Sequence, residues 1–264
     1  IYTSAIVGSS DVYKRQTIST SGSLSAFSTC EGSASSEQDF SVSGSGLTAD
    51  ITVTAPSGFE VSTTSGGSFG SSVTLSQSGG SVSSTTVYVR LASASVSSGA
   101  SDTPSGNITC ASTGASTKNV SASGTVYNTP SSAAGSDISQ CDNASFTLAA
   151  TNPSFGTGAW SVTSGSASIT SSSSYNSGVT GVTADNSATL RWTVSNGTCT
   201  AATDDVVLSN NSNPTASAST STGTVCEGTA ISLTGGASGG SGGGYSYSWS
   251  GPSSYTSSSQ SPTI

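Results

Sequence analysis

The sequence predicts an all-β protein made of tandem antiparallel β-sandwiches, and three observations support this. Short runs alternate apolar and polar residues with period two, as strands with one buried face do. Gly-, Ser- and Pro-rich turns separate the runs at roughly 8–12-residue spacing, which is typical of sandwiches. No segment shows a sustained helical period. The alternating runs are Asp50–Ala55, Ser72–Ser76, Thr86–Leu91, Asn107–Cys110, Lys118–Ala122, Ser145–Leu148, Thr189–Val194 and Ala230–Leu233.

Composition leaves disorder as the rival interpretation. The chain of 264 residues is poor in large apolar side chains and carries a formal net charge of −8, and such chains often stay unfolded. However, only 7% of its residues are charged, and the apolar residues are arranged in alternation. Ser and Thr fill the exposed positions, and Thr suits strands in its own right. This arrangement favours folded sandwiches everywhere except near the C-terminal end.

The charge balance excludes nucleic acid as a partner, because binding phosphates requires clustered Lys and Arg. After residue 16, only the scattered Arg90, Lys118 and Arg191 remain. No run approaches the roughly 18 apolar residues of a membrane span, so no membrane insertion is predicted here. Residues 1–16 lack the apolar core of a signal peptide. Because the sequence contains no Met, we expect it to be an internal piece of a longer polypeptide.

Five cysteines are spread along the chain, with no C-x-x-C pair and no His to complete a zinc site. We predict the disulfides Cys30–Cys110 and Cys141–Cys199, because each pair lies near the two ends of one proposed sandwich. One disulfide per thinly cored sandwich indicates an oxidising, extracellular or cell-surface location. The alternative is a set of buried free thiols in a cytosolic protein.

Cys226 is the odd cysteine, and an internal repeat accounts for it. The residues Thr29–Gly32 recur as Val225–Gly228, both containing Cys-Glu-Gly. Cys141 and Cys226 are each followed by apolar residues at the fifth and seventh positions. These similarities indicate the same opening strand in successive modules. We therefore expect Cys226 to be unpaired because its module is truncated, not because its thiol is reactive.

Two groups of motifs resemble known repeat modules. Residues 17–127 resemble an Ig-like module of large secreted and cell-surface proteins of Bacteroidetes-type bacteria, through Ser23–Phe27, Asp39–Gly44, Ala55–Ser62, Thr86–Leu91 and Ser105–Thr109. Residues 128–213 resemble the PKD-like repeats found beside it, through Gly158–Val162, Ala188–Val194, Asn196–Cys199 and Asp204–Leu208. Residues 214–264, with Tyr247–Pro252, resemble the start of another such module. The resemblance implies adhesins, gliding-motility proteins or spacer regions of secreted enzymes, and no catalytic residues.

The leader, residues 1–16, lies outside the first module that the resemblance defines. Its segment Asp11–Gln16 resembles the in-frame translation of a transposon end used in preparing sequencing libraries. We therefore expect residues 1–16 to be non-native and to pack against nothing. The alternative is a natural linker with a processing site at Lys14-Arg15.

Catalysis, cofactors and metals are not predicted. A Ser-His-Asp arrangement is impossible without His. The carboxylates that a glycosidase would need lie at strand ends and turns without an accompanying basic or aromatic cleft, namely Glu31, Glu37, Asp39, Glu60, Asp204 and Asp205. Calcium would suit oxygen ligands at Asp137, Asp142, Asp204 and Asp205, but the spaced pattern of a calcium loop is absent. A solvated acidic edge that discourages aggregation is favoured instead.

The aromatic residues can be interpreted either as core side chains or as a sugar-binding surface. Trp160, Trp192 and Trp249 each lie in a strand-like run, where a sandwich usually buries such a side chain. Tyr245, Tyr247 and Trp249 share one face and could instead stack on sugars, although a core role is favoured for Trp249. We expect a structural and adhesive spacer that contacts surface glycans or other proteins. The alternatives are an accessory carbohydrate-binding region of a secreted polysaccharide-degrading enzyme, and an enzyme whose catalytic domain lies elsewhere in the polypeptide.

Overall fold

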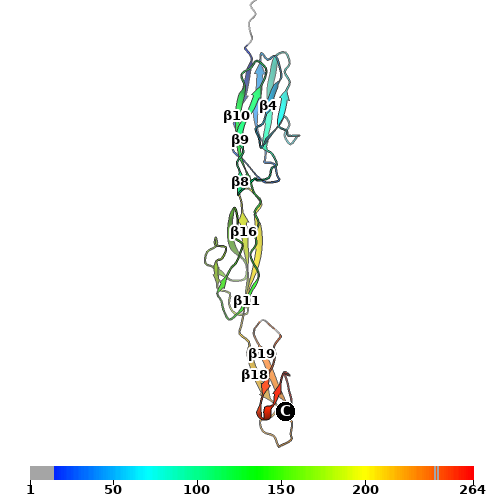
Figure 1. The fold of residues 1–264 in the computed structure, drawn as a ribbon, viewed down its shortest axis with the longest axis vertical. Helices are drawn as coiled ribbons and strands as arrows, with labels where there is room; N and C mark the ends of the chain where they lie inside the picture. Colours follow the sequence, from blue (N-terminus) through cyan, green and yellow to red (C-terminus); the bar gives the residue numbers. More distant parts are fainter. Residues whose placement is uncertain (1–14, 241, 243) are drawn as a thin grey trace, which may run out of the picture. The chain divides into compact units, whose positions relative to one another are not determined.

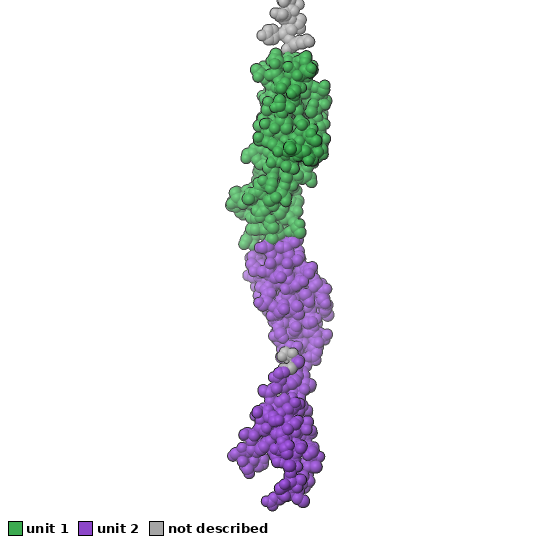
Figure 2. All heavy atoms as spheres, turned by 90° about the vertical axis from the view of Figure 1, so that its right-hand side faces the viewer, with its two compact units in different colours: residues 1–130, 154–156, 195–200 green, residues 131–153, 157–194, 201–264 purple. Residues whose placement is uncertain are grey.

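The computed structural model describes residues 15–264 except 241 and 243 (Figure 1). These residues form β-strands and a single 3-10 turn, η1 (Pro252–Ser254), and no α-helix occurs among them. The predicted fold class, all-β with tandem β-sandwiches, is confirmed. The chain divides into two compact units, coloured separately in Figure 2. Of the described residues, unit 1 comprises 15–130, 154–156 and 195–200, and unit 2 comprises 131–153, 157–194 and 201–264 except 241 and 243.

Unit 1 contains two facing sheets. The first has the order β1-β3-β7-β5, formed by β1 (Thr17–Ser21), β3 (Gln38–Ser45), β7 (Ser81–Leu91) and β5 (Phe59–Ser62). The second has the order β2-β10-β9-β4-β6, with β8 also paired to β10. Its strands are β2 (Phe27–Cys30), β10 (Lys118–Tyr127), β9 (Ser105–Ala111), β4 (Ile51–Thr54), β6 (Ser72–Leu75) and β8 (Ser101–Asp102).

The strand order of unit 1 is that of an immunoglobulin sandwich. The order β1-β3-β7-β5 matches A-B-E-D, and β10-β9-β4 matches G-F-C. The strand β2 runs parallel to the end of β10, while the neighbouring pairs β10–β9 and β9–β4 are antiparallel. Unit 1 is therefore Ig-like by topology.

Alternation within the strands builds the core of unit 1. Strand β4 buries Ile51 and Val53 and exposes the threonines between them, as the period of two requires. The rings of Phe27 and Phe59 meet edge to face at 5.7 Å between centroids, a favoured aromatic geometry. The most deeply buried side chains are Phe40, Val42, Ile51, Val53, Val61, Val87, Val89, Leu91 and Ile108.

Unit 2 holds a second sandwich between residues 131 and 211. One sheet has the order β11-β17-β16-β13 and the other β12-β15-β14. Three of these strands, β13, β16 and β17, match C-F-G, and the smaller sheet matches B-E-D. The bounds are β11 (Ile138–Cys141), β12 (Phe146–Thr147), β13 (Thr157–Ser164), β14 (Ser168–Ile169), β15 (Gly178–Thr180), β16 (Asn186–Ser195) and β17 (Ala202–Asn211).

Two tryptophans anchor the core of this second sandwich. Trp160 on β13 and Trp192 on β16 are 3% and 1% exposed, and their ring centroids lie 5.0 Å apart. The core role predicted for both side chains is confirmed. Leucine and valine side chains from the hairpin β16–β17 complete the core, namely Leu190, Val194, Val206 and Leu208.

Residues 214–264, also in unit 2, form two separate two-stranded sheets. Strand β18 (Thr215–Thr220) pairs with β19 (Leu233–Ser238), and β20 (Trp249–Ser250) pairs with β21 (Thr256–Ser257). The chain end runs along β19, since the amide of Leu233 donates to the carbonyl of Pro262 at 2.9 Å. All six residues of β18 are exposed, so β18 has no buried face.

Most of the expected non-native leader lies outside the described residues, which begin at Arg15. The expectation that residues 1–16 pack against nothing is wrong for the last of them, Gln16. The Gln16 amide donates a hydrogen bond to Thr48 Oγ1 at 3.3 Å, and the side chain lies close to Gly114. Gln16 therefore packs against the first sandwich, because it directly precedes β1.

Candidate functional site

Most of the carboxylates considered for catalysis have structural partners. Glu31 accepts a hydrogen bond from the amide of Thr129 at 2.9 Å, and this bond lowers the pKa of Glu31. Glu37 accepts hydrogen bonds from the Ser65 hydroxyl and from the Gly66 amide, and both lower its pKa. A carboxylate whose charged form is stabilised in this way is a poor general acid at neutral pH.

Two further carboxylates, Glu60 and Asp205, form ion pairs with arginines. Glu60 lies 3.0 Å from Arg90 Nη2, and the Arg90 guanidinium stacks over the Phe69 ring at 4.1 Å. Asp205 accepts two hydrogen bonds from Arg191, at 2.7 and 2.8 Å, and this pairing lowers the pKa of Asp205. Asp39 is exposed on β3.

The four acids considered for calcium make separate contacts. Asp204 accepts from the Ala134 amide at 2.7 Å and Asp137 from the Val207 amide at 2.8 Å. Asp142 accepts from the Asn213 side chain at 3.2 Å, and Asp205 pairs with Arg191. Within the described residues, no three His, Cys, Asp or Glu side chains group closely enough to hold a metal ion.

The cysteine pairing predicted from the sequence is wrong. The structure joins Cys30 to Cys199, with their Cα atoms 4.9 Å apart. Cys110, Cys141 and Cys226 are free within the described chain, the first buried and the other two exposed. Cys226 was expected to be unpaired.

Strand geometry explains the correction. Cys110 follows Ile108 by two residues on β9, so both side chains point into the core and both are fully buried. Cys30 instead ends β2, beside Tyr127 in the parallel register with β10. Cys141 ends β11, opposite Asn211, and is exposed. The partner of Cys30 comes from the turn that joins β16 to β17.

This turn, residues 195–200, is fixed within unit 1 by more than the disulfide. The side-chain amide of Asn196 donates to the carbonyls of Ala100 and Asn128, at 2.9 and 2.8 Å. Gly197 has a φ of 53° and lies against the ring of Tyr127, where a larger residue would be strained and would clash. Asn196-Gly197 is thus a turn dipeptide with a second, tertiary role.

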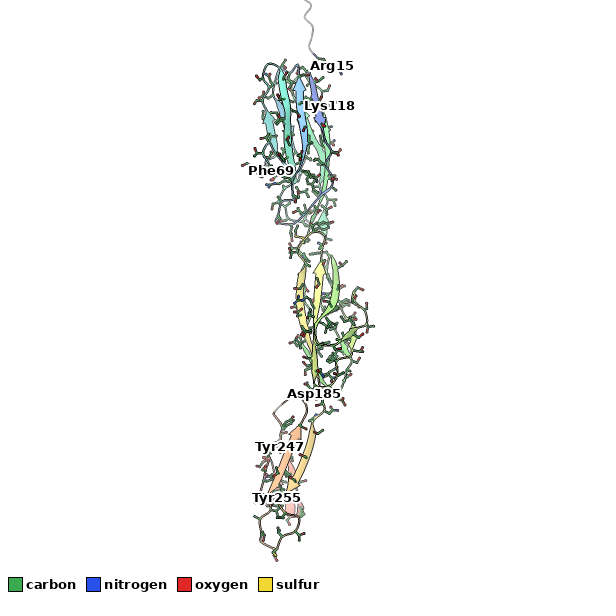
Figure 3. The ribbon with its side chains drawn as sticks, turned by 180° about the vertical axis from the view of Figure 1, so that it is seen from behind. Arg15, Phe69, Lys118, Asp185, Tyr247 and Tyr255 are labelled. Atoms are coloured by element: carbon green, nitrogen blue, oxygen red, sulfur yellow. A yellow bond between two sulfur atoms is a disulfide. The ribbon has the colours of Figure 1, made fainter. Side chains whose placement is uncertain are left out.

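The other candidate surface is a groove of about 740 Å³ in residues 214–249. Three aromatic side chains line it, from Tyr245, Tyr247 and Trp249, and all three are half-buried. Trp249, for which a core role was favoured, is therefore only half-buried. Figure 3 marks Tyr247 beside the β18–β19 pair.

The groove floor consists of small residues. The rings of Tyr247 and Trp249 lie against Gly235 on β19, and the remaining lining includes Ala216, Ala218, Gly236 and Ala237. None of the lining residues is charged. The Trp249 indole donates to the carbonyl of Ser259 at 2.8 Å, so its ring is held in place. The lining combines aromatic faces, small side chains and hydroxyl groups without charge, which suits an uncharged partner.

Comparisons with known proteins give no family. No family model matches the chain, and no curated protein matches it. Among solved structures, the ectodomain Ig1–Ig3 of mouse nectin-like molecule 4 matches with 13% identity and a TM-score of 0.45, covering 91% of this chain and 87% of that chain. DIP-gamma Ig1 and Ig2 match with 12% identity and a TM-score of 0.36, covering 73% and 97%. Similarity with such low identity and TM-scores does not support any inference about function.

One further finding bears on membranes. In the part of the chain that the structure describes, no helix is long and apolar enough to cross a bilayer.

Proposed function

We propose that this chain is a non-catalytic structural and adhesive repeat region of a large secreted or surface-anchored bacterial protein, acting as a spacer and binding scaffold. Its modules are residues 17–127, 128–213 and 214–264, preceded by the non-native leader 1–16. The modules present loops and strand edges to surface glycans or to other proteins, outside the cell.

One observation carries this proposal. The side chains that could take part in catalysis instead make structural contacts within each Ig-type sandwich. The carboxylates of Glu31, Glu37 and Asp204 bind backbone amides, and the tryptophans Trp160 and Trp192 fill a core. A disulfide supports an oxidising location. Such a construction favours mechanical and presenting roles over catalysis.

The rival function is an accessory carbohydrate-binding region, and the aromatic groove is the observation that favours it. A pull-down of the full chain on cellulose, chitin and xylan, together with a glycan array, separates the two. A spacer leaves the chain in the supernatant and the array blank. The matched control is Tyr255→Ser, an aromatic residue outside the groove lining. Retention on one polysaccharide that is lost in Trp249→Ser but kept in Tyr255→Ser would overturn the spacer proposal in favour of the rival.

A further inference from the structure

Cys141 occupies the same place in the second sandwich that Cys30 occupies in the first. Cys30 is the last residue of β2, and it lies in parallel register with Tyr127, the last residue of β10. Cys141 is the last residue of β11, and it lies in parallel register with Asn211, the last residue of β17. The residue that follows each cysteine donates its amide to the carbonyl of this same partner, at 2.8 and 2.7 Å. The two cysteines are therefore equivalent in strand, register and hydrogen bonding.

The two equivalent cysteines differ in their bonding. Cys30 forms a disulfide with Cys199, which lies in the turn between β16 and β17 of the sandwich that follows along the chain. These two strands match F and G of an Ig sandwich. Cys141 is exposed and free within the described chain, although the equivalent cysteine of the preceding sandwich is bonded. The bond of Cys30 therefore indicates what Cys141 is placed to bind.

The segment after β17 begins to repeat the arrangement that holds this turn. The strands β13 and β20 each carry a tryptophan. The loop before β13, residues 154–156, is grouped with unit 1, as is the turn 195–200. The loop before β20 lies at the end of β17, since the amide of Gly240 donates to the carbonyl of Ser212 at 2.6 Å. Because the loop before strand C and the F–G turn lie at one end of an Ig sandwich, an F–G turn that follows β20 would reach Cys141.

Cys226 is a further member of this series and not a counterpart of Cys199. Like Cys30, it begins the sequence Cys-Glu-Gly. The residue three positions after each of these two cysteines donates its amide to the cysteine carbonyl, at 3.2 and 3.0 Å. The glycine of each sequence has a positive φ, 76° for Gly32 and 82° for Gly228. Cys226 therefore has the local structure of Cys30, whereas Cys199 lies in a hairpin turn.

We propose that Cys141 is the disulfide site for the F–G turn of the module that follows, so that successive modules are bonded as Cys30 is bonded to Cys199. The oxidant is a low-molecular-weight or protein disulfide. The thiolate of one cysteine attacks it and expels one thiolate, and the thiolate of the other cysteine then displaces the second from the mixed disulfide. Two cysteine thiols are oxidised to one disulfide, the oxidant is reduced to two thiols, and the protons of the cysteines pass to the leaving thiolates.

The test inserts a second copy of residues 128–211 between residues 211 and 212 of the full chain. The insertion follows Asn211 because this residue corresponds to Tyr127, so the spacing between modules is kept. In the inserted copy, Cys141→Ser removes the second equivalent site, and Thr200→Ser marks the peptide of its Cys199 by mass. The added copy thus supplies a following module with a known F–G turn.

The protein is folded in a glutathione redox buffer, alkylated with iodoacetamide, and digested with pepsin at low pH, where thiolates are too scarce for disulfides to exchange. Mass spectrometry should find the marked Cys199 peptide linked to Cys141 and the unmarked one linked to Cys30. Acrylamide quenching of tryptophan fluorescence shows whether the inserted copy has buried its tryptophans and is folded.

Two variants of this protein are matched controls. With Cys141→Ser in the first copy as well, the marked Cys199 should be alkylated, whereas Cys110→Ser should leave both bonds in place. In a folded inserted copy, a marked Cys199 that is alkylated, or that is linked to Cys226, overturns the proposal.

The second arm uses the polypeptide isolated from the cells that make it, and it decides the question if the inserted copy does not fold. The peptide that contains Cys141 should be linked there to a cysteine in the F–G turn of the following module. Cys141 recovered as an alkylated thiol, or linked to Cys226, overturns the proposal. The inference rests on the proposed division into modules and not on binding, so a missing bond is distinguishable from a failure of the binding role, which the pull-down measures.

Discussion

At the residue scale, the contact between Gly158 and the ring of Trp192 leaves no space for a side chain. A methyl group at position 158 would overlap the six-membered part of that ring, and the ring is itself held by Trp160. We expect Gly158→Ala to lower the free energy of unfolding by about 1–3 kcal/mol, as overpacking does. Urea denaturation followed by tryptophan fluorescence measures the change.

The matched control is Gly223→Ala. Among the described residues, nothing lies within 4 Å of a methyl group at position 223, and the backbone there does not have a positive φ. Its effect should stay within about 0.5 kcal/mol. Equal denaturation midpoints for the two variants would show that the Trp192 ring moves aside freely.

The buried thiol of Cys110 should make the stability of the fold depend on pH. Burial raises the pKa of its thiol from 9.0 to about 11, because the apolar core disfavours the thiolate. Between these values the unfolded chain loses the proton while the folded chain retains it. The contribution of this thiol to stability is therefore complete below about pH 9 and is lost as the pH rises toward 11.

Urea denaturation at pH 8 and at pH 10.5 measures this effect. In Cys110→Ala the loss of stability between the two pH values should be smaller than in the parent chain. The control is Ile108→Val, a buried position on the same strand without a titratable group, which should keep the parent's pH dependence. If Cys110→Ala instead loses as much stability as the parent over this range, the thiol is not the titrating group.

At the element scale, the turn between β16 and β17 depends on Asn196. Its side chain is 6% exposed and bonds to two backbone carbonyls of unit 1. Removing it leaves both carbonyls without this donor, so Asn196→Ala should cost about 1–3 kcal/mol. Thermal or urea unfolding measures the loss. The control is Asn119→Ala at an exposed position of β10, and a comparable loss there would contradict a specific role for the turn.

Most strands were predictable, because a strand that buries one face alternates apolar and polar residues along its sequence. The run Asp50–Ala55 became β4, and Thr86–Leu91 became the second half of β7. Strand β19 was missed, since the predicted run Ala230–Leu233 ends where β19 begins. Its Gly235 and Gly236 carry no apolar side chain, so the strand depends on pairing with β18, which a local pattern does not record.

The disulfide could not be predicted from positions along the chain. Alternation placed Cys110 on the same core-facing side as Ile108, but this did not decide its pairing, because a core-facing cysteine can form a disulfide, as the one between strands B and F of antibody domains does. The true partner, Cys199, lies in a hairpin turn that contacts β2 and β10. Such a tertiary contact leaves no periodic trace in the sequence. The aromatic groove was only half predictable, because shared parity places Tyr245, Tyr247 and Trp249 on one face without showing what covers them.

At the scale of the whole molecule, the Cys30–Cys199 bond determines how far the chain extends under load. It joins residues 169 positions apart, and an extended residue spans about 3.3–3.6 Å. The bond therefore withholds about 560–610 Å of contour length from a chain pulled at its two ends. Tension passes through the bond and bypasses most strands of both Ig-type sandwiches.

Single-molecule force spectroscopy with and without dithiothreitol tests this consequence. The oxidised chain should stop extending about 560–610 Å short of the reduced chain. Cys30→Ser should extend fully under both conditions, and Cys110→Ser should behave as the parent does. A Cys30–Cys110 bond would withhold less than half of this length, and Cys110→Ser would then release it. For a spacer at a cell surface, the observed bond sets a limit on extension that persists after the sandwiches lose their folded structure.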